Sequence, residues 1–167
     1  MTAIIRHHYI QESKDSESSK EAERVAMRIS SKGRYAVRLM LDLEINDSGE
    51  PVRLKDAARR QNISEKYLEQ VISILNKAGY VRSIRGPQGG YVLANQPSWY
   101  TMGMILRLTE GSLCPVDYET DGFREEAESA TSILWDKLNN AINEVVDNIT
   151  LEDLMEWQMA KADSYVI

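Results

Sequence analysis

The feature that most constrains the fold is a glycine-rich loop between two short runs of β-prone residues. The loop Arg85-Gly86-Pro87-Gln88-Gly89-Gly90 follows a run over residues 80–84 and precedes a run over residues 91–93. Glycine adopts positive φ readily and lets another backbone approach closely, so three glycines and a proline predict a tight reversal of the chain. The pattern therefore predicts a β-hairpin with Arg85 at the mouth of its loop.

Three helices are predicted immediately before this hairpin, over residues 31–45, 54–61 and 65–78. Apolar residues recur at helical spacing in each, and polar or glycine-containing stretches separate them. Ser64 is placed to cap the third helix by accepting a backbone hydrogen bond, and Gly79 follows the end of that helix. A helix pair joined by a short turn and followed by a hairpin predicts a winged helix-turn-helix, which binds DNA.

The third predicted helix carries polar side chains on the face away from its apolar stripe. In a helix-turn-helix the first residues of the second helix reach base edges in the major groove, where glutamine can pair with adenine. Such a mixture is also typical of a solvated face, but the neighbouring helix and hairpin favour DNA binding. Arg85 suits a narrow minor groove, and basic residues at the start of the first helix suit phosphates unless they are merely exposed. The predicted DNA-binding residues are Lys32, Arg34, Ser64, Lys66, Tyr67, Glu69, Gln70, Arg85, Gly86, Gln88 and Gly89.

Charge is divided unevenly along the chain. Residues 27–93 contain 12 Lys and Arg against 7 Asp and Glu, a net charge of +5, whereas residues 94–167 contain 4 against 14, a net charge of −10. Residues 1–26 contribute −1, which gives the overall net charge of −6. A basic segment followed by an acidic one indicates that one half faces phosphates while the other stays away from them.

The second half of the chain predicts a helix over residues 101–110, a long helix, and a final helix over 151–159 capped by Thr150 and Asp153. The long helix has apolar residues three or four positions apart. So long an apolar face has too little domain left to cover it, so we expect it to form a homodimer contact. The predicted dimerisation residues are Leu134, Leu138, Ala141, Ile142, Val145 and Ile149.

The fold class predicted from these patterns is mostly α with a small β-wing: a winged helix-turn-helix domain plus a long C-terminal dimerisation helix. We expect residues 1–26 to be a disordered N-terminal extension and 27–111 to be the DNA-binding domain. Residues 112–160 should hold the loop and dimerisation helices, and residues 161–167 a C-terminal tail.

Catalytic, cofactor-binding and membrane roles find little support in the sequence. No carboxylate pair stands near a candidate nucleophile, and the single cysteine, Cys114, completes neither a disulfide nor a metal site within the chain. No apolar run approaches the roughly 18 residues of a membrane span, and no secretory signal is evident. We therefore expect a cytoplasmic protein that is not an enzyme and holds no metal or cofactor.

Three motifs together resemble the bacterial Rrf-two winged-helix regulators, over about residues 27–111. The motifs are residues 29–36 (ISSKGRYA), 67–70 (YLEQ) and 85–91 (RGPQGGY). The resemblance implies homodimers that bind palindromic operators, with a long helix near the C-terminus crossing to the partner. It also implies recognition-helix contacts at Ser64, Lys66, Tyr67, Glu69 and Gln70 and a wing contact at Arg85.

Several members of that family hold an iron–sulfur cluster with three cysteines in the loop after the 101–110 helix, where this chain has only Cys114. The sequence instead resembles the CymR-like branch, which lacks the cluster and represses genes of cysteine and sulfur metabolism. The resemblance implies that such a regulator acts in a complex with the enzyme cysteine synthase. The chain's last residues also resemble the tail of serine acetyltransferase, which inserts a terminal isoleucine carboxylate into that synthase. This resemblance implies partner-binding roles for Tyr165, Val166 and Ile167, against the alternative of a frayed end.

The leading hypothesis is a sequence-specific transcriptional repressor of cysteine and sulfur metabolism genes that signals through a complex with cysteine synthase. One alternative is a regulator of the same fold that senses oxidation, or an externally completed metal site, at Cys114. Another is an interaction adaptor that does not read DNA, which the positive charge of residues 27–93 disfavours.

Overall fold

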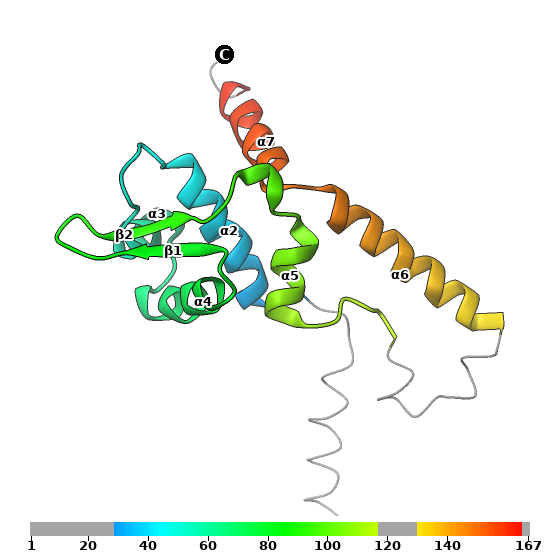
Figure 1. Ribbon diagram of the computed structural model, residues 1–167. Helices are drawn as coiled ribbons and strands as arrows, with labels where there is room; N and C mark the ends of the chain where they lie inside the picture. The colour runs from blue at the N-terminus through cyan, green and yellow to red at the C-terminus, as the bar shows by residue number, and fades with distance from the viewer. Residues whose placement is uncertain (1–28, 117–129, 165–167) are drawn as a thin grey trace, which may run out of the picture. The chain divides into compact units, whose positions relative to one another are not determined.

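The computed structural model describes residues 29–116 and 130–164 (Figure 1). The described residues divide into two units, one of residues 29–113 and 140–164 and the other of residues 114–116 and 130–139. The elements in chain order are α2 (Ser31–Ile45), α3 (Leu54–Gln61), α4 (Glu65–Lys77), β1 (Val81–Ile84), β2 (Gly90–Leu93), the short 3-10 helix η1 (Pro97–Trp99), α5 (Met102–Glu110), α6 (Ala130–Asn148) and α7 (Leu151–Asp163).

Local chemistry accounts for the starts of α2 and α4 and for the end of α3. Ser30 caps α2 by accepting a hydrogen bond from the backbone N–H of Gly33, and Ser64 caps α4 by accepting one from Tyr67. Between α3 and α4, Asn62 adopts a left-handed conformation with φ of 54°, which an asparagine tolerates better than most residues. This turn makes the α3–α4 pair a helix-turn-helix.

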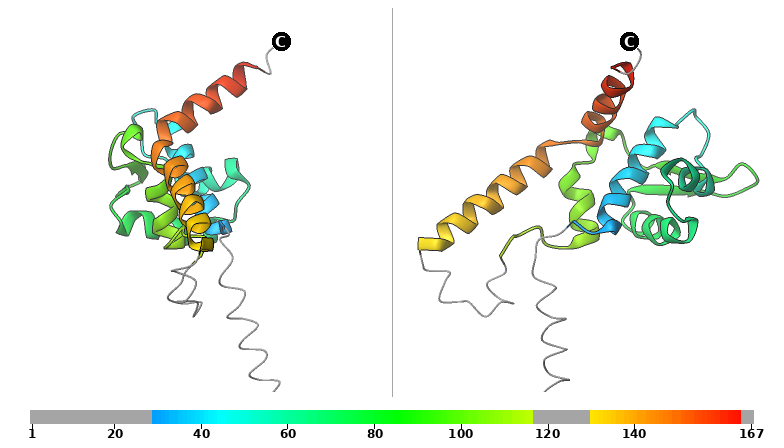
Figure 2. Two further views of the ribbon diagram at one scale, coloured as in Figure 1. Left: turned by 90° about the vertical axis from the view of Figure 1, so that its right-hand side faces the viewer. Right: turned by 180° about the vertical axis from the view of Figure 1, so that it is seen from behind.

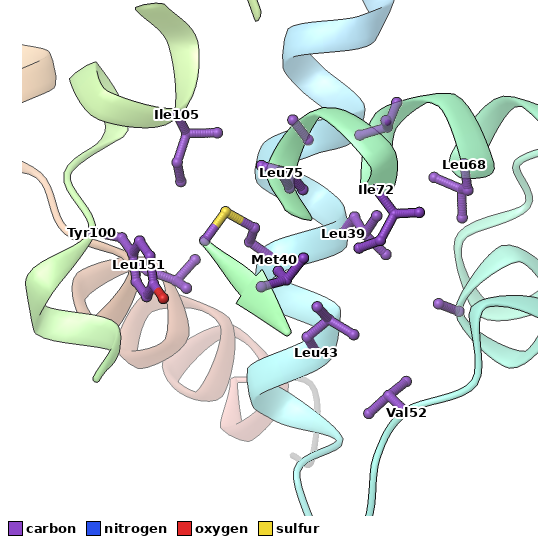
Figure 3. Packing of buried hydrophobic residues seen from close by; sticks show 14 of the residues in the cluster. Leu39, Met40, Leu43, Val52, Leu68, Ile72, Leu75, Tyr100, Ile105 and Leu151 are labelled. Atoms are coloured by element: carbon purple, nitrogen blue, oxygen red, sulfur yellow. The ribbon is translucent and has the colours of Figure 1, made fainter. Parts of the chain in front are cut away.

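The core lies around α2, which packs against α3, α4, α5 and α7. Leu39 and Met40 of α2, Leu68 and Leu75 of α4, and Ile105 of α5 are all fully buried. Figure 3 shows these side chains pointing toward one another from the surrounding helices. Burying a leucine fully stabilises a fold by about 1.5–3 kcal/mol, so this cluster accounts for much of what holds the helix-turn-helix in place.

The two strands form the predicted hairpin. They pair antiparallel, with Val81 opposite Leu93 and Ile84 opposite Gly90, and their connecting loop projects away from the helices (Figures 1 and 2). The segment before α3 joins the sheet through an antiparallel bridge between Val52 and Tyr91. The hairpin is thus attached to the helix-turn-helix at its base.

A buried tyrosine organises the chain after the hairpin. The Tyr100 hydroxyl donates to the carbonyl of Tyr80 and accepts from the backbone N–H groups of Ala94 and Asn95. On both sides of the next residue, Thr101, the backbone is tied to the α6–α7 junction, because Met102 N–H donates to the Ile149 carbonyl and Leu151 N–H to the Tyr100 carbonyl. The C-terminal end of α6 and the start of α7 are therefore held against the helix-turn-helix unit.

The predicted fold class is confirmed, and the predicted bounds of α2 and α3 match the structure. Helix α4 ends at Lys77, one residue earlier than expected, and α7 continues to Asp163, beyond the expected end at residue 159. The capping box of α7 forms as predicted, since the Thr150 side chain and the Asp153 side chain each accept a backbone hydrogen bond from the other residue. The four domain boundaries stay a prediction, and residues 1–26 lie outside the described part of the chain.

Candidate nucleic-acid interface

The N-terminal half of α4 has one buried face and one exposed polar face. Leu68, Val71 and Ile72 are at most 2% exposed, which fixes the rotation of the helix about its axis. Because the helix period is 3.6 residues, this rotation leaves Lys66, Glu69 and Gln70 exposed on the opposite side. The structure thus places these three predicted residues together on one accessible face, as direct reading of base edges requires.

Tyr67 and Ser64 have structural contacts in addition to their predicted roles. Ser64 is the N-cap of α4, and its hydroxyl oxygen accepts from the Tyr67 N–H at 3.2 Å. The Tyr67 ring is half-buried and meets the ring of Tyr35 edge-on, with centroids 5.5 Å apart. The guanidinium carbon of Arg38 lies over the Tyr35 ring, 5.6 Å from the centroid of that ring. These contacts join the first turn of α4 to the N-terminal half of α2.

At the start of α2, the two predicted phosphate contacts differ in exposure. Arg34 is exposed, and its guanidinium donates to the Ser31 hydroxyl at 3.1 Å, whereas Lys32 is half-buried. The preceding cap residue, Ser30, donates its hydroxyl to the carboxylate of Glu110 at 2.8 Å. The start of α2 is therefore anchored to the end of α5. This contact fixes the backbone that carries Lys32 and Arg34.

The hairpin loop exposes its arginine and turns through glycine. Arg85, Gly86 and Gln88 are exposed, and Gly89 is half-buried. Gly86 has φ of 119°, a conformation that residues with a side chain rarely adopt, and its carbonyl accepts from the Gly89 N–H at 2.9 Å. A short turn of this kind keeps the loop narrow, which suits entry of an arginine into a minor groove.

Two charged residues of this region were missed by the sequence analysis, and the first is Arg53. It directly precedes α3, and one guanidinium nitrogen donates to the Pro87 carbonyl at 3.1 Å and to the Gln88 side-chain oxygen at 2.6 Å. Arg53 and Gln88 also line an open hollow of about 490 Å³ between the 46–53 segment, α3 and the hairpin loop. No local pattern could have identified Arg53, because its partners lie more than thirty residues later.

The second missed residue is Asp42, a carboxylate that is only 3% exposed. It accepts two hydrogen bonds from Arg60, at 3.1 and 2.6 Å, and one from the Gln61 amide at 2.9 Å. The side-chain hydrogen bond to Asp42 is the main reason that the pKa of Arg60 is raised. Gln61 in turn accepts from Arg38 of α2, so this network fixes α3 against α2. The partners of Asp42 lie 18 and 19 residues later in the sequence, so α2 by itself gives no signal for it.

The long helix α6 has no fully buried side chain. Leu134 is 51% exposed, Leu138 42% and Val145 57%, while the neighbouring Ile142 is half-buried and Ala141 exposed. Ile149, just beyond the helix, packs against the core of its own chain together with Val146. At the same end, Arg107 of α5 donates to Asp147 at 2.5 Å, which lowers the pKa of that carboxylate.

Other features of the described residues bear on the remaining predictions. Cys114 is exposed, and its thiol lies 3.0 Å from the Val116 carbonyl. Within residues 29–116 and 130–164, no group of three His, Cys, Asp or Glu side chains is arranged to hold a metal ion. None of the helices in that part of the chain has the length and apolar character that a membrane crossing requires. Tyr165, Val166 and Ile167 lie outside the described residues.

A helix-turn-helix with an exposed polar face on its second helix, followed by a hairpin, is an arrangement typical of DNA-binding proteins. The family model described as Rrf2, iron-dependent transcriptional regulator, matches residues 29–157. The chain belongs to the Rrf2 (Rrf-two) family. It is therefore a DNA-binding transcriptional regulator, as its sequence predicts, and its known relatives are regulators rather than enzymes.

Individual relatives match over most of their length. The HTH-type transcriptional regulator CymR of Bacillus subtilis is 41% identical over 140 residues, which cover 84% of this chain and 98% of that protein. The HTH-type transcriptional regulator IscR of Pectobacterium atrosepticum is 41% identical over 133 residues, covering 77% of this chain and 79% of that protein. The solved structure of CymR, the global cysteine regulator of B. subtilis, has a TM-score of 0.70 and 43% identity, covering 78% of this chain and 97% of that one. The predicted likeness to CymR is confirmed.

Proposed function

We propose that this protein is a repressor that binds a near-palindromic operator as a homodimer and regulates genes of cysteine and sulfur metabolism. The observation that carries the proposal is the pairing of an exposed α4 face with an arginine-tipped wing, in a chain 41% identical to CymR. In this proposal Lys66, Glu69 and Gln70 face base edges in the major groove, and Arg85 enters the minor groove. Ser64, Tyr67, Lys32 and Arg34 contact the phosphate backbone.

The dimer is proposed on the exposed apolar face of α6. Three large side chains on it, Leu134, Leu138 and Val145, are 42–57% exposed, although apolar residues at helical spacing are normally covered. A second copy of the same helix is chemically suited to cover this face. A two-fold dimer presents two recognition helices about 34–36 Å apart, which is one turn of DNA.

Selection of duplexes from a random library by the full-length protein tests the DNA-binding part of the proposal. We expect an enriched sequence with two inverted half-sites, about one helical turn apart. Each variant is then titrated with that duplex at several salt concentrations. Gln70→Ala should lose discrimination at one base position. Arg85→Ala should weaken binding and reduce the slope of affinity against salt. If the selection enriches no sequence, the DNA-binding proposal fails and the hypothesis of an interaction adaptor replaces it.

The proposed signal is a complex with cysteine synthase through residues 163–167. A terminal isoleucine carboxylate suits a site that holds an amino-acid carboxylate, with Val166 adding apolar contact and Tyr165 a stacking surface. Because tail and substrate would use the same donors, O-acetylserine should displace the tail. When O-acetylserine accumulates the complex would then separate and repression would ease.

Calorimetry of a peptide spanning residues 163–167 against cysteine synthase tests this signal directly. Binding that O-acetylserine abolishes supports the proposal, and the same peptide with an amidated terminus is the control for the carboxylate. Binding that is absent, or indifferent to O-acetylserine, counts against the tail. A parallel titration with Cys114→Ser then examines the alternative, in which an oxidant alters operator affinity through the exposed thiol.

A further inference from the structure

The wing is supported by a residue that lies outside the hairpin. Arg53, just before α3, reaches the hairpin loop and donates from a single guanidinium nitrogen to two acceptors, the Pro87 carbonyl at 3.1 Å and the Gln88 side-chain oxygen at 2.6 Å. Both acceptors are neutral, but the donor is charged, and such hydrogen bonds are stronger than neutral ones. Both contacts are made to the loop that directly follows Arg85.

The base of the wing has a separate attachment to the same segment. Val52 N–H donates to the Tyr91 carbonyl at 3.0 Å, and Tyr91 N–H donates to the Val52 carbonyl at 2.9 Å. Gly90 allows this approach, since a Cβ there would lie 2.5 Å from the Val52 oxygen. Residues 52 and 53 therefore hold the hairpin at two levels, the base through the backbone and the loop through the Arg53 side chain.

The loop needs such support because a two-stranded hairpin is only marginally stable by itself. Residues 82–88 are all exposed, so burial contributes little to fixing the loop. Within the loop, the Gly89–Gly86 backbone bond closes the turn without attaching it to the helices. Arg53 connects the loop to the first helix of the helix-turn-helix, and so couples the position of the wing to that of the recognition helix.

We propose that Arg53 is a positioning residue for DNA binding: it holds the wing loop in the place from which Arg85 reaches the minor groove. Its contact also orients Gln88, because the amide oxygen is taken by Arg53 and the NH₂ group is left to donate. Phosphate oxygens and the minor-groove edge of A·T pairs present acceptors, which suits that orientation. This inference rests on the proposed wing contact of Arg85.

A double-mutant cycle with Arg85 tests the inference, using the full-length protein and its selected operator duplex. We expect Arg53→Ala to lower operator affinity about tenfold, the size expected from losing a charged hydrogen bond that acts through Arg85. In the Arg85→Ala background the same substitution should lower affinity less than about twofold, because there is no longer an arginine to position. Arg59→Ala is the matched control, because Arg59 is an exposed arginine of α3 that pairs with Asp56.

Backbone ¹⁵N relaxation of the free protein supplies a second readout that does not depend on DNA. Arg53→Ala should lower the order parameters of Gly86 and Gly89 toward the flexible range, below about 0.6, while those of α3 and α4 stay near the wild-type values. Arg59→Ala should leave the loop unchanged. Unchanged order parameters in Arg53→Ala would overturn the inference, since the loop would then be held by other means.

The outcomes separate this inference from the function on which it rests. Equal losses from Arg53→Ala with and without Arg85 would mean that Arg53 acts independently, as a phosphate contact of its own, and would also overturn the positioning role. If Arg85→Ala by itself binds the operator normally, the proposed minor-groove contact fails, and the positioning role fails with it. Coupled losses together with a loosened loop support both.

Discussion

Helices α4 and α6 have the same amphipathic pattern but differ in how far their apolar faces are buried. In α4 the apolar stripe of Leu68, Val71 and Leu75 is completely buried, and its polar face is exposed. In α6 the apolar residues Leu134 and Leu138 are about half exposed, although their spacing is the same. Periodicity therefore identifies which face of a helix needs a cover, but not which molecule supplies that cover.

The difference lies in what each helix has beside it. Helix α4 packs against α2, α3, β1 and α5, so its stripe is covered within its own chain. The C-terminal end of α6 is held to its own chain through Arg107 and through the Tyr100–Leu151 and Met102–Ile149 backbone bonds. In the proposed dimer, the apolar face of α4 packs in the core and its polar face contacts DNA bases, whereas the apolar face of α6 contacts the second protomer.

The largest effect is expected from placing a charge on the exposed face of α6. Leu138→Asp would put an unpaired carboxylate into the seam of each protomer, and burying such a group without a partner costs several kcal/mol. We expect monomers in sedimentation at micromolar concentration, and operator affinity reduced to the level of non-specific binding. A variant that remains dimeric would mean that a different surface forms the contact.

The next effect separates folding from assembly by truncating one leucine on each helix. Leu68→Ala removes a side chain that is 0% exposed and should lower the free energy of unfolding by about 2–5 kcal/mol. Leu134→Ala, made in the monomeric Leu138→Asp background, should change it by less than about 0.5 kcal/mol. Urea unfolding of both variants gives the comparison. A large loss from Leu134→Ala would show that α6 already buries this face within its own chain.

A smaller effect is expected on the other face of α4, two residues from Leu68. Gln70→Ala should cost about 1–3 kcal/mol of binding to the selected operator, and leave the free energy of unfolding within about 0.5 kcal/mol of the wild type. Asn76→Ala, an exposed substitution near the C-terminal end of the helix, serves as the control. Equal losses from the two substitutions would argue that the start of α4 has no special part in reading bases.

The local structure was predictable because its causes are local. Ser64 and Thr150 predict helix starts, because an N-cap involves only the next three residues, and both caps form. The contacts that set the geometry of the interface are not local. Arg53 meets the hairpin across 35 positions, and Asp42 meets Arg60 and Gln61 across 18 and 19, so no pattern within one element reveals them. Exposure of α6 is also beyond the pattern, since it depends on which neighbours the fold supplies.

The smallest expected effect concerns the joint that holds the end of α6. Arg107 donates to Asp147 and lowers the pKa of its carboxyl below the ordinary value of 3.8. The folded state therefore favours the charged form, so the stabilisation is present above about pH 4 and is lost as the pH falls through the lowered pKa. Both side chains are more than a third exposed, 38% and 46%, so solvent screening limits the contribution to within about 1 kcal/mol.

Urea unfolding at pH 7 and at steps between about pH 4 and pH 2 measures this contribution. Asp147→Asn should be slightly less stable than the wild type at pH 7, and the difference should shrink as the pH falls, because the wild type then loses the same charge. Asp136→Asn, about three turns earlier on α6, removes an equal charge and serves as the control for the loss of a carboxylate from this helix. If the gap between Asp147→Asn and the wild type stays constant with pH, the ion pair does not hold this joint. The end of α6 would then be held by the hydrogen bond from Arg107 to Asn143, by the backbone bonds on either side of Thr150 and by the packing of Val146 and Ile149, as α4 is held by packing.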